Sequence, residues 1–223
     1  GLVTREVTTL EPVPGGFSAL YAVLRRLEET GRVRRGYFVA GLGGAQFARP
    51  GALDRLRAER DPANEPRAVT VSATDPANPY GAIVDWPAWH GTGTLKASRV
   101  AGARVVIVDG HATAWIARGN RQLLVALPAE EPDRGRRQRA LARELVRLAH
   151  DSAEARRGWL IAEVNGEPAA ASAIAAACVD AGFAVTSGGL QLRVARRGPA
   201  AASSRGPDPS EPGRESEPEA SDA

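Results

Sequence analysis

The sequence contains no methionine, a single lysine and a single cysteine among its 223 residues. Because a natural reading frame begins with methionine, the opening Gly1 predicts a chain that was processed, trimmed or cut from a longer one. Lys96 is the only lysine, so 28 of the 29 basic residues are arginines. Arginine stays charged and binds phosphate or carboxylate through a planar fork, so its basic side chains suit those two anions.

Cysteine and histidine are too sparse for the sites that they usually build. Cys178 cannot form an intrachain disulfide, and His90, His111 and His150 show no clustered zinc-ligand spacing. We therefore expect neither a metal nor a bound cofactor in this chain, and a reducing, cytoplasmic environment. No apolar run approaches the length of a membrane span and no signal peptide leads the chain, so no membrane partner is expected.

The glycine and lysine pattern excludes a conventional nucleotide-hydrolysing motor. A P-loop needs a Gly-Lys pair, because its lysine must reach the phosphates from a tight glycine turn. Lys96 instead follows Leu95, and no adjacent Asp-Glu pair offers a metal-binding motif of the DEAD type. Any ATP-driven activity must therefore come from another part of a larger protein.

Charge is unevenly distributed along the chain. Residues 198–223 are rich in Pro, Ser, Glu, Gly and Ala and carry two arginines against six acids. Such a segment buries too little apolar surface to offset its ordering entropy, so we predict a disordered acidic tail. The net charge of +3 then leaves about +7 on residues 1–197, which permits contact with phosphates. The predicted units are a winged-helix module over 1–60, a sheet domain over 66–197 and the tail over 198–223.

Residues 1–60 follow the order of a winged helix, in which a helix precedes a two-stranded hairpin. Apolar side chains repeat on one helical face at Phe17, Leu20, Tyr21, Leu24 and Leu27. Strands are predicted over 32–39 and 45–48, joined by a glycine-rich turn, with a short helix over 50–59. In this fold the helix lies in the major groove and the hairpin touches the DNA backbone. The predicted DNA-binding side chains are Arg25, Arg26, Arg32, Arg34 and Arg35.

The next segment predicts an α+β domain built on a mixed antiparallel sheet or a small β-barrel. Strands are predicted over 69–73, 105–108, 112–117 and 122–126, with Asp109-Gly110 and Gly119-Asn120 at hairpin spacing. A long helix over 134–157 and a strand over 159–164 follow. A second helix is predicted to open at Glu167 or Pro168 and to run to about Asp180, before two closing strands over 183–185 and 190–194.

Three aspartates in or beside the loops of this domain, Asp75, Asp85 and Asp109, are the candidates for catalysis. One carboxylate can position water or stabilise an oxocarbenium-like state, as a DNA glycosylase requires. Asp75 precedes a proline and Asp109 precedes a glycine, which is also ordinary turn chemistry. Trp86 and Trp89 could stack on unpaired bases or pack the core. Both interpretations stay open for each of these residues.

Several segments, in this order and spacing, resemble the C-terminal part of the large helicase-related proteins, which are bacterial superfamily 2 DNA helicases. They are VPGGF (13–17), GRVRRGYF (31–38), GGAQFARPGA (43–52), DRLR (54–57), ATDPANPYG (73–81) and GGLQLR (188–193). The resemblance covers roughly residues 1–195. It implies a full protein with two RecA-like ATPase domains, which would bind ATP and Mg²⁺, together with winged-helix modules and a β-barrel-like module.

The resemblance also implies translocation on single-stranded DNA and a role in DNA repair. The first helix of a complete winged helix is expected to lie before Gly1. In long family members the extended C-terminal region is similar to DNA glycosylases, some of which are linked to uracil removal. Three hypotheses follow: a DNA-binding accessory region of a helicase, a glycosylase-like enzyme, and a protein-interaction or oligomerisation module. The expected partners are single-stranded or duplex DNA, the remainder of the helicase chain, and a second copy of this chain.

Overall fold

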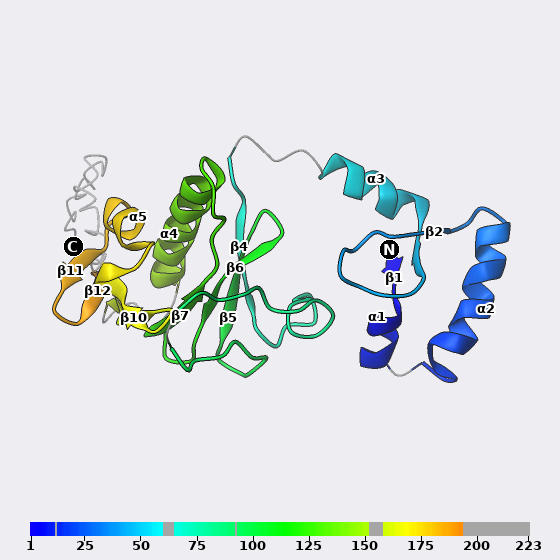
Figure 1. The fold of residues 1–223 in the computed structure, drawn as a ribbon, viewed down its shortest axis with the longest axis horizontal. Helices are drawn as coiled ribbons and strands as arrows, with labels where there is room; N and C mark the ends of the chain where they lie inside the picture. The colour runs from blue at the N-terminus through cyan, green and yellow to red at the C-terminus, as the bar shows by residue number, and fades with distance from the viewer. Residues whose placement is uncertain (12, 60–64, 92, 152–157, 194–223) are drawn as a thin grey trace, which may run out of the picture.

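The computed structural model describes residues 1–11, 13–59, 65–91, 93–151 and 158–193. The fold is mixed α+β, as predicted (Figure 1), and the described residues form three sheets and few helices. The predicted tail over 198–223 lies outside the described residues, and so does the end of the predicted long helix at 152–157. No helix among the described residues is long and apolar enough to cross a membrane.

The N-terminal module has the helix-then-hairpin order that the sequence predicts. Its elements are β1 (Leu2–Val3), α1 (Arg5–Leu10), α2 (Gly16–Glu29), β2 (Arg34–Gly36), β3 (Gln46–Ala48) and α3 (Pro50–Ala58). The three strands form an antiparallel sheet in the order β1-β3-β2. The apolar face of α2 packs on this sheet around three buried side chains, Leu24, Val33 and Phe47. Thr4 caps α1, because its hydroxyl accepts a hydrogen bond from the Val7 amide at 3.4 Å.

The second domain is built on a six-stranded sheet. Its strands are β4 (Ala68–Ser72), β5 (Arg104–Val108), β6 (His111–Ile116), β7 (Gln122–Val125), β9 (Glu163–Val164) and β10 (Glu167–Pro168). Their order is β10-β9-β7-β6-β5-β4, and every pairing is antiparallel except that of β7 with β9. Within the described residues the two edge strands do not pair, so the sheet is open and the barrel alternative does not form.

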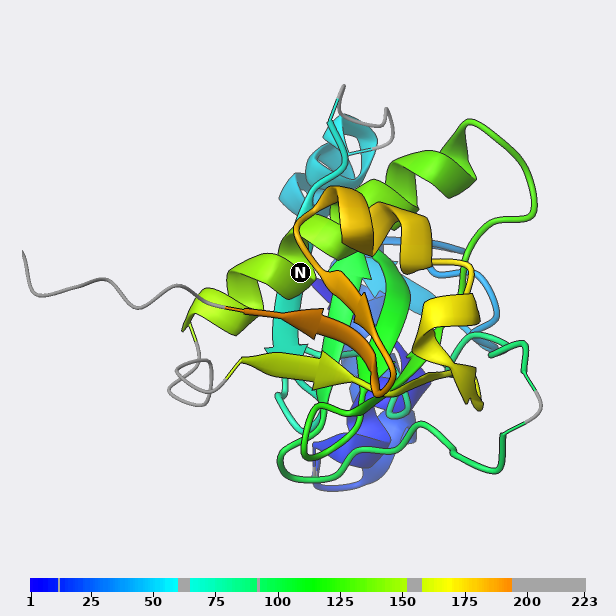
Figure 2. The ribbon, with the colours of Figure 1, turned by 90° about the vertical axis from the view of Figure 1, so that its left-hand side faces the viewer.

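Both faces of this sheet are covered. The long helix α4 (Asp133–Asp151) packs across β4, β5 and β6, and α5 (Ala175–Asp180) packs beside it. A second small sheet, ordered β11-β12-β8, contributes to the same core and lies next to α5 (Figure 2). Its strands are β8 (Trp159–Ile161), β11 (Ala184–Thr186) and β12 (Gly189–Leu192). On the opposite face, a loop segment contributes Tyr80, Trp86 and Trp89 to a core around Trp115.

Two predicted elements differ from the structure. The single strand expected over 159–164 is divided into β8 and β9, which belong to different sheets. The helix expected from Glu167 or Pro168 is replaced by β10, a 3-10 turn (Ala169–Ala171) and the later helix α5. Asn165 and Gly166 take left-handed backbone angles, with φ of 56° and 81°, and join β9 to β10 as a two-residue hairpin. An Asn-Gly pair is the strongest local signal for such a turn, so this signal outweighs the helix-forming alanines that follow it.

Candidate nucleic-acid interface

The outward face of α2 carries mostly small side chains. Helical spacing places Ala19, Ala22, Val23 and Arg26 on one exposed stripe, opposite the side that packs on the sheet. Val23 is 54% exposed, and the stripe ends with a cation near the helix C-terminus, where positive charge is favourable. Small side chains let a helix backbone approach a groove closely. This face of α2 therefore suits close contact with a nucleic-acid groove, with Arg26 as its charged contact.

The five predicted DNA-binding arginines are all exposed, but they fall into two groups. Arg25 pairs with Glu29 at 3.5 Å, and Arg35 pairs with Glu28 at 3.4 Å. Arg35 also donates to the Tyr21 hydroxyl at 3.3 Å. The remaining three, Arg26, Arg32 and Arg34, have no ion pair within the part of the chain that the structure describes.

Strand register explains why neighbouring arginines differ. Arg35 is paired with Phe47 across β2 and β3, so its side chain lies on the face that packs against α2. Arg34 is paired with Ala48 and points to the opposite face. Alternation therefore directs Arg35 toward Glu28 and Tyr21 and leaves Arg34 available to a ligand.

The loop between β2 and β3, residues 37–45, is called the wing here. Gln46 is fully buried beneath it and uses every hydrogen-bonding position of its amide. Its Oε1 accepts from the Phe38 and Val39 amides, both at 2.8 Å. Its Nε2 donates to the Val39 and Leu42 carbonyls at 3.0 and 3.2 Å. One side chain thus holds most of the wing in a defined conformation.

The three predicted catalytic aspartates are not brought together. Asp75 Oδ1 accepts from the Ala77 amide at 2.8 Å, and Asp109 Oδ1 accepts from the Arg67 amide at 2.8 Å. These are turn-stabilising bonds, and the two residues lie at opposite ends of β4, a five-residue strand about 16 Å long, because Asp75 follows its last residue and Asp109 follows Val108, the partner of its first residue. Asp85 is exposed in the loop between them. Each remains a catalytic candidate only on its own.

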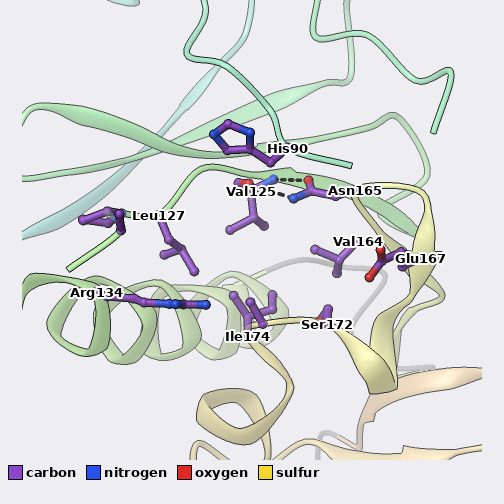
Figure 3. A pocket seen from close by; sticks show the side chains of 12 residues that line it. His90, Val125, Leu127, Arg134, Val164, Asn165, Glu167, Ser172 and Ile174 are labelled. Atoms are coloured by element: carbon purple, nitrogen blue, oxygen red, sulfur yellow. Dashed lines mark hydrogen bonds between the residues drawn. The ribbon is translucent and has the colours of Figure 1, made fainter. Parts of the chain in front are cut away.

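A cavity of about 420 Å³ lies elsewhere in the second domain (Figure 3). Its polar lining includes Arg134 from the first turn of α4, Glu167 from β10, Ser172, and His90 from the loop between β4 and β5, which is named the covering loop. The Asn165 amide also lines it, but it is engaged with both backbone groups of Val125, at 2.7 and 2.9 Å. An acid, a base and a cation therefore surround one space, and Glu167 is the carboxylate that sequence reasoning missed.

Two glycines hold the covering loop close to the cavity. A Cβ on Gly91 would lie 2.1 Å from the Asn165 carbonyl oxygen, and one on Gly93 would lie 2.8 Å from Gly166 Cα. The loop that carries His90 is therefore packed directly on the β9–β10 turn. Glu167 follows that turn, so the same contact places both sides of the cavity.

Three further side chains, those of Cys178, His111 and Trp115, lie outside the cavity lining. Cys178 is fully buried, and burial raises the pKa of its thiol to about 12, which disfavours the reactive thiolate. Burial and the nearby Arg137 lower the pKa of the His111 imidazole. Trp115 is a core residue whose Nε1 donates to the Ser98 carbonyl at 3.1 Å. No group of His, Cys, Asp or Glu suited to a metal ion occurs among the described residues.

Known proteins match this chain along most of its length. Residues 1–68 match the family described as the large helicase-related protein, winged-helix domain. The chain is 40% identical over 204 residues to the "Lhr helicase/ probable uracil glycosylase" of Mycolicibacterium smegmatis. The chain belongs to the large helicase-related (Lhr) family. This confirms the resemblance that the sequence segments indicate, and the order of α2, β2 and β3 agrees with it.

A second Lhr relative has a similar relationship to the chain. It is the "Lhr helicase/uracil glycosylase" of Escherichia coli, 36% identical over 193 residues. The two matches cover 86% and 85% of this chain but only 13% and 12% of the relatives. The chain thus spans about an eighth of the length of these Lhr proteins.

Proposed function

We propose that this chain is a DNA-binding accessory region of an ATP-dependent helicase that acts in DNA repair. The observation that carries the proposal is the surface of the winged-helix module, where Arg26, Arg32 and Arg34 are exposed and form no ion pair with any described residue. In winged helices the helix before the hairpin enters the major groove, and the hairpin contacts phosphates. The family relationship supports a place for this surface beside a helicase motor.

The motor itself belongs to the remainder of the helicase chain in this proposal. ATP and Mg²⁺ bind there, because Lys96 follows a leucine and offers no P-loop here. The accessory region contributes affinity through phosphate contacts, each of which releases counterions from DNA. A surface of this kind keeps the protein bound to DNA while the ATPase domains translocate along it.

Anisotropy with labelled single-stranded and duplex DNA across a salt series tests this proposal. Replacing Arg26, Arg32 or Arg34 with Gln should weaken binding and lower the slope of log K against log salt by about one each. Arg143→Gln, an exposed arginine on α4, is the matched control and should leave the slope unchanged. Unchanged slopes in all three variants, or no binding at low salt, would falsify the assignment.

A second candidate function is DNA glycosylase activity, favoured by the cavity and by the names of both Lhr relatives, each of which includes uracil glycosylase. Glu167 would position water or stabilise the oxocarbenium-like state of the sugar. Arg134 or His90 would stabilise negative charge that develops on the departing base. The cavity thus offers the two electrostatic elements that cleavage of a glycosidic bond requires.

Alkali-labile sites in a uracil-containing strand provide the readout for the second function. Glu167→Gln should abolish them, whereas Asp75→Asn, Asp85→Asn and Asp109→Asn should not. Loss of activity in one of the aspartate variants, with Glu167→Gln still active, would instead return the catalytic role to that aspartate. Self-association of a chain that neither binds nor cleaves DNA would support the oligomerisation module.

A further inference from the structure

Tyr37 is held in an unusually exposed position. It is 90% exposed, the highest value among the large hydrophobic side chains that the structure describes at the surface. An aromatic ring usually contributes far more to stability when it is buried. The next residue, Phe38, is partly buried and packs against Gly36, where an added Cβ would lie 2.9 Å from the ring. The chain therefore turns one aromatic ring inward and leaves its neighbour outward.

The backbone around Tyr37 is fixed on both sides. On one side, Gly36 is paired with Gln46 in the β2–β3 ladder. On the other side, the Phe38 and Val39 amides donate to Gln46 Oε1 at 2.8 Å. The ring is thus presented from a defined point at the start of the wing, which lowers the entropy lost when a ligand stacks on it.

The charge of the surrounding segment is of one sign. Residues 30–53 contain no acidic side chain, but they include Arg32, Arg34, Arg35 and Arg49. Arg34 precedes Tyr37 by three residues and has no ion pair among the described residues. The same short segment thus carries an exposed aromatic ring and, among the described residues, guanidinium groups without an ion pair. These are the two elements that bind single-stranded nucleic acid, namely a stacking surface and phosphate contacts.

We propose that Tyr37 is a stacking platform for an unpaired base of single-stranded DNA, with Arg34 and Arg32 contacting the flanking phosphates. This inference rests on the proposed DNA-binding function and assigns the wing to the single-stranded part of the substrate. Stacking on a ring tolerates every base, because each base has a π-face, so the site selects strand state and not sequence. The outward stripe of α2 then contacts the adjoining duplex.

The test uses the whole chain and short single strands that carry 2-aminopurine, whose fluorescence is quenched on stacking. Tyr37→Ala should weaken single-strand binding about 5- to 150-fold and abolish the quenching. Tyr37→Phe should retain both, because the phenyl ring still stacks. Val185→Ala, at a 60% exposed position of the second domain, is the control and should change neither. The salt slope of Tyr37→Ala should match that of the unmodified chain, because the arginines remain.

The outcomes separate this inference from the function on which it rests. Unchanged single-strand affinity and quenching in Tyr37→Ala, with salt slopes still dependent on the arginines, would overturn the platform and leave the DNA-binding proposal intact. Equal losses on single-stranded and fully duplex DNA would also overturn it, since a duplex has no unpaired base. A chain that binds no DNA would end both proposals. Circular dichroism melting should be unchanged in Tyr37→Ala, because the ring is exposed.

Discussion

The two parts of this chain use their residues differently. In the N-terminal module the hydrophobic cluster of the described residues has three buried side chains, with six partly buried ones around them. In the second domain one cluster alone contains 21 buried residues, and a further cluster lies on the other face of the sheet. Stability grows with buried apolar area, so the second domain is the robust framework and the module is the marginal part.

Charged groups show the same contrast. In the second domain Glu144 is only 5% exposed, and it accepts hydrogen bonds from Arg147 and Thr70. In the module, the pairs Arg25–Glu29 and Arg35–Glu28 lie at the surface, where an ion pair contributes little and a phosphate can compete for the arginine. The pair between the buried Glu144 and Arg147 thus stabilises the second domain, whereas the surface pairs of the module leave their arginines available to phosphate.

Phe47→Ala should break this contrast most strongly. The ring is buried between α2 and the sheet, where it packs edge-on against Tyr21 at 5.8 Å, and its removal should cost about 3–5 kcal/mol. A hydrophobic cluster with three buried residues contributes too little stability to tolerate this loss of free energy. Residues 1–58 should therefore unfold while the second domain stays folded. Hydrogen exchange resolved by segment should show protection lost only in the module.

The matched variant is Ile161→Ala in the larger cluster. Its cost, about 2–5 kcal/mol, should lower the melting temperature of the second domain without unfolding it. If Phe47→Ala removes protection from both parts together, the two do not fold independently and the comparison fails.

Arg147→Met should have the next largest effect. Arg147 donates to Glu144 at 2.8 and 2.6 Å and to Asp151 at 2.6 Å. The variant leaves Glu144 buried with Thr70 as its remaining donor, at 2.5 Å, which should cost roughly 1–3 kcal/mol at pH 7. Urea denaturation of the full chain measures this difference.

The pH dependence gives this prediction its sign. Burial alone would raise the pKa of the Glu144 carboxyl, but hydrogen bonds from Arg147 and Thr70 hold that pKa below its usual value. In the unmodified chain this stability is complete above the unfolded pKa of about 4.3 and is lost as pH falls through the lower folded value. In Arg147→Met the pKa rises, so the destabilisation should shrink as pH falls from 7 to about 4. A constant difference would contradict the role of the Glu144 charge.

Local sequence signals account for most of the module but little of the cavity. The apolar repeat of α2 and the glycines of the wing predict their elements because each depends on neighbours within one turn or one hairpin. The position of Arg35 could not be predicted in the same way, because it depends on the register that pairs it with Phe47. An Arg-rich strand alone does not reveal which arginines face inward.

The cavity depends on contacts that no local pattern contains. His90 and Glu167 are 77 positions apart, and they meet because the covering loop packs on the Asn165-Gly166 turn. That Asn-Gly pair is a hairpin signal in the sequence, and it predicts a strand at Glu167–Pro168, where β10 lies, in place of the start of a helix. The close approach of Gly91 to Asn165 could not be read from the sequence, because it is a tertiary contact.

Gln46→Ala should have a smaller and local effect. Four hydrogen bonds from the wing would lose their partner, at a cost of about 1–3 kcal/mol because water replaces part of them. The Phe38 and Val39 amides should exchange with solvent faster, while the amides of α2 keep their protection. Quenching of 2-aminopurine should also weaken, since Tyr37 would no longer be presented from a fixed backbone. Unchanged exchange at these two amides would show that the wing is held by other contacts.

Glu28→Gln should have the smallest effect on stability and a revealing effect on binding. The Arg35–Glu28 pair is partly exposed, so its loss should cost only about 0.2–1 kcal/mol. Without that carboxylate, Arg35 can reach a phosphate, and the module loses one negative charge. Affinity for single-stranded DNA at low salt should therefore rise about two- to threefold, a gain comparable with the energy of the pair.

The matched control is Glu29→Gln. It releases Arg25 from a pair that is already more exposed, with side chains 68% and 63% accessible, and should raise affinity less. Equal gains in the two variants would mean that net charge alone sets binding, whereas a larger gain for Glu28→Gln would place Arg35 at the DNA backbone.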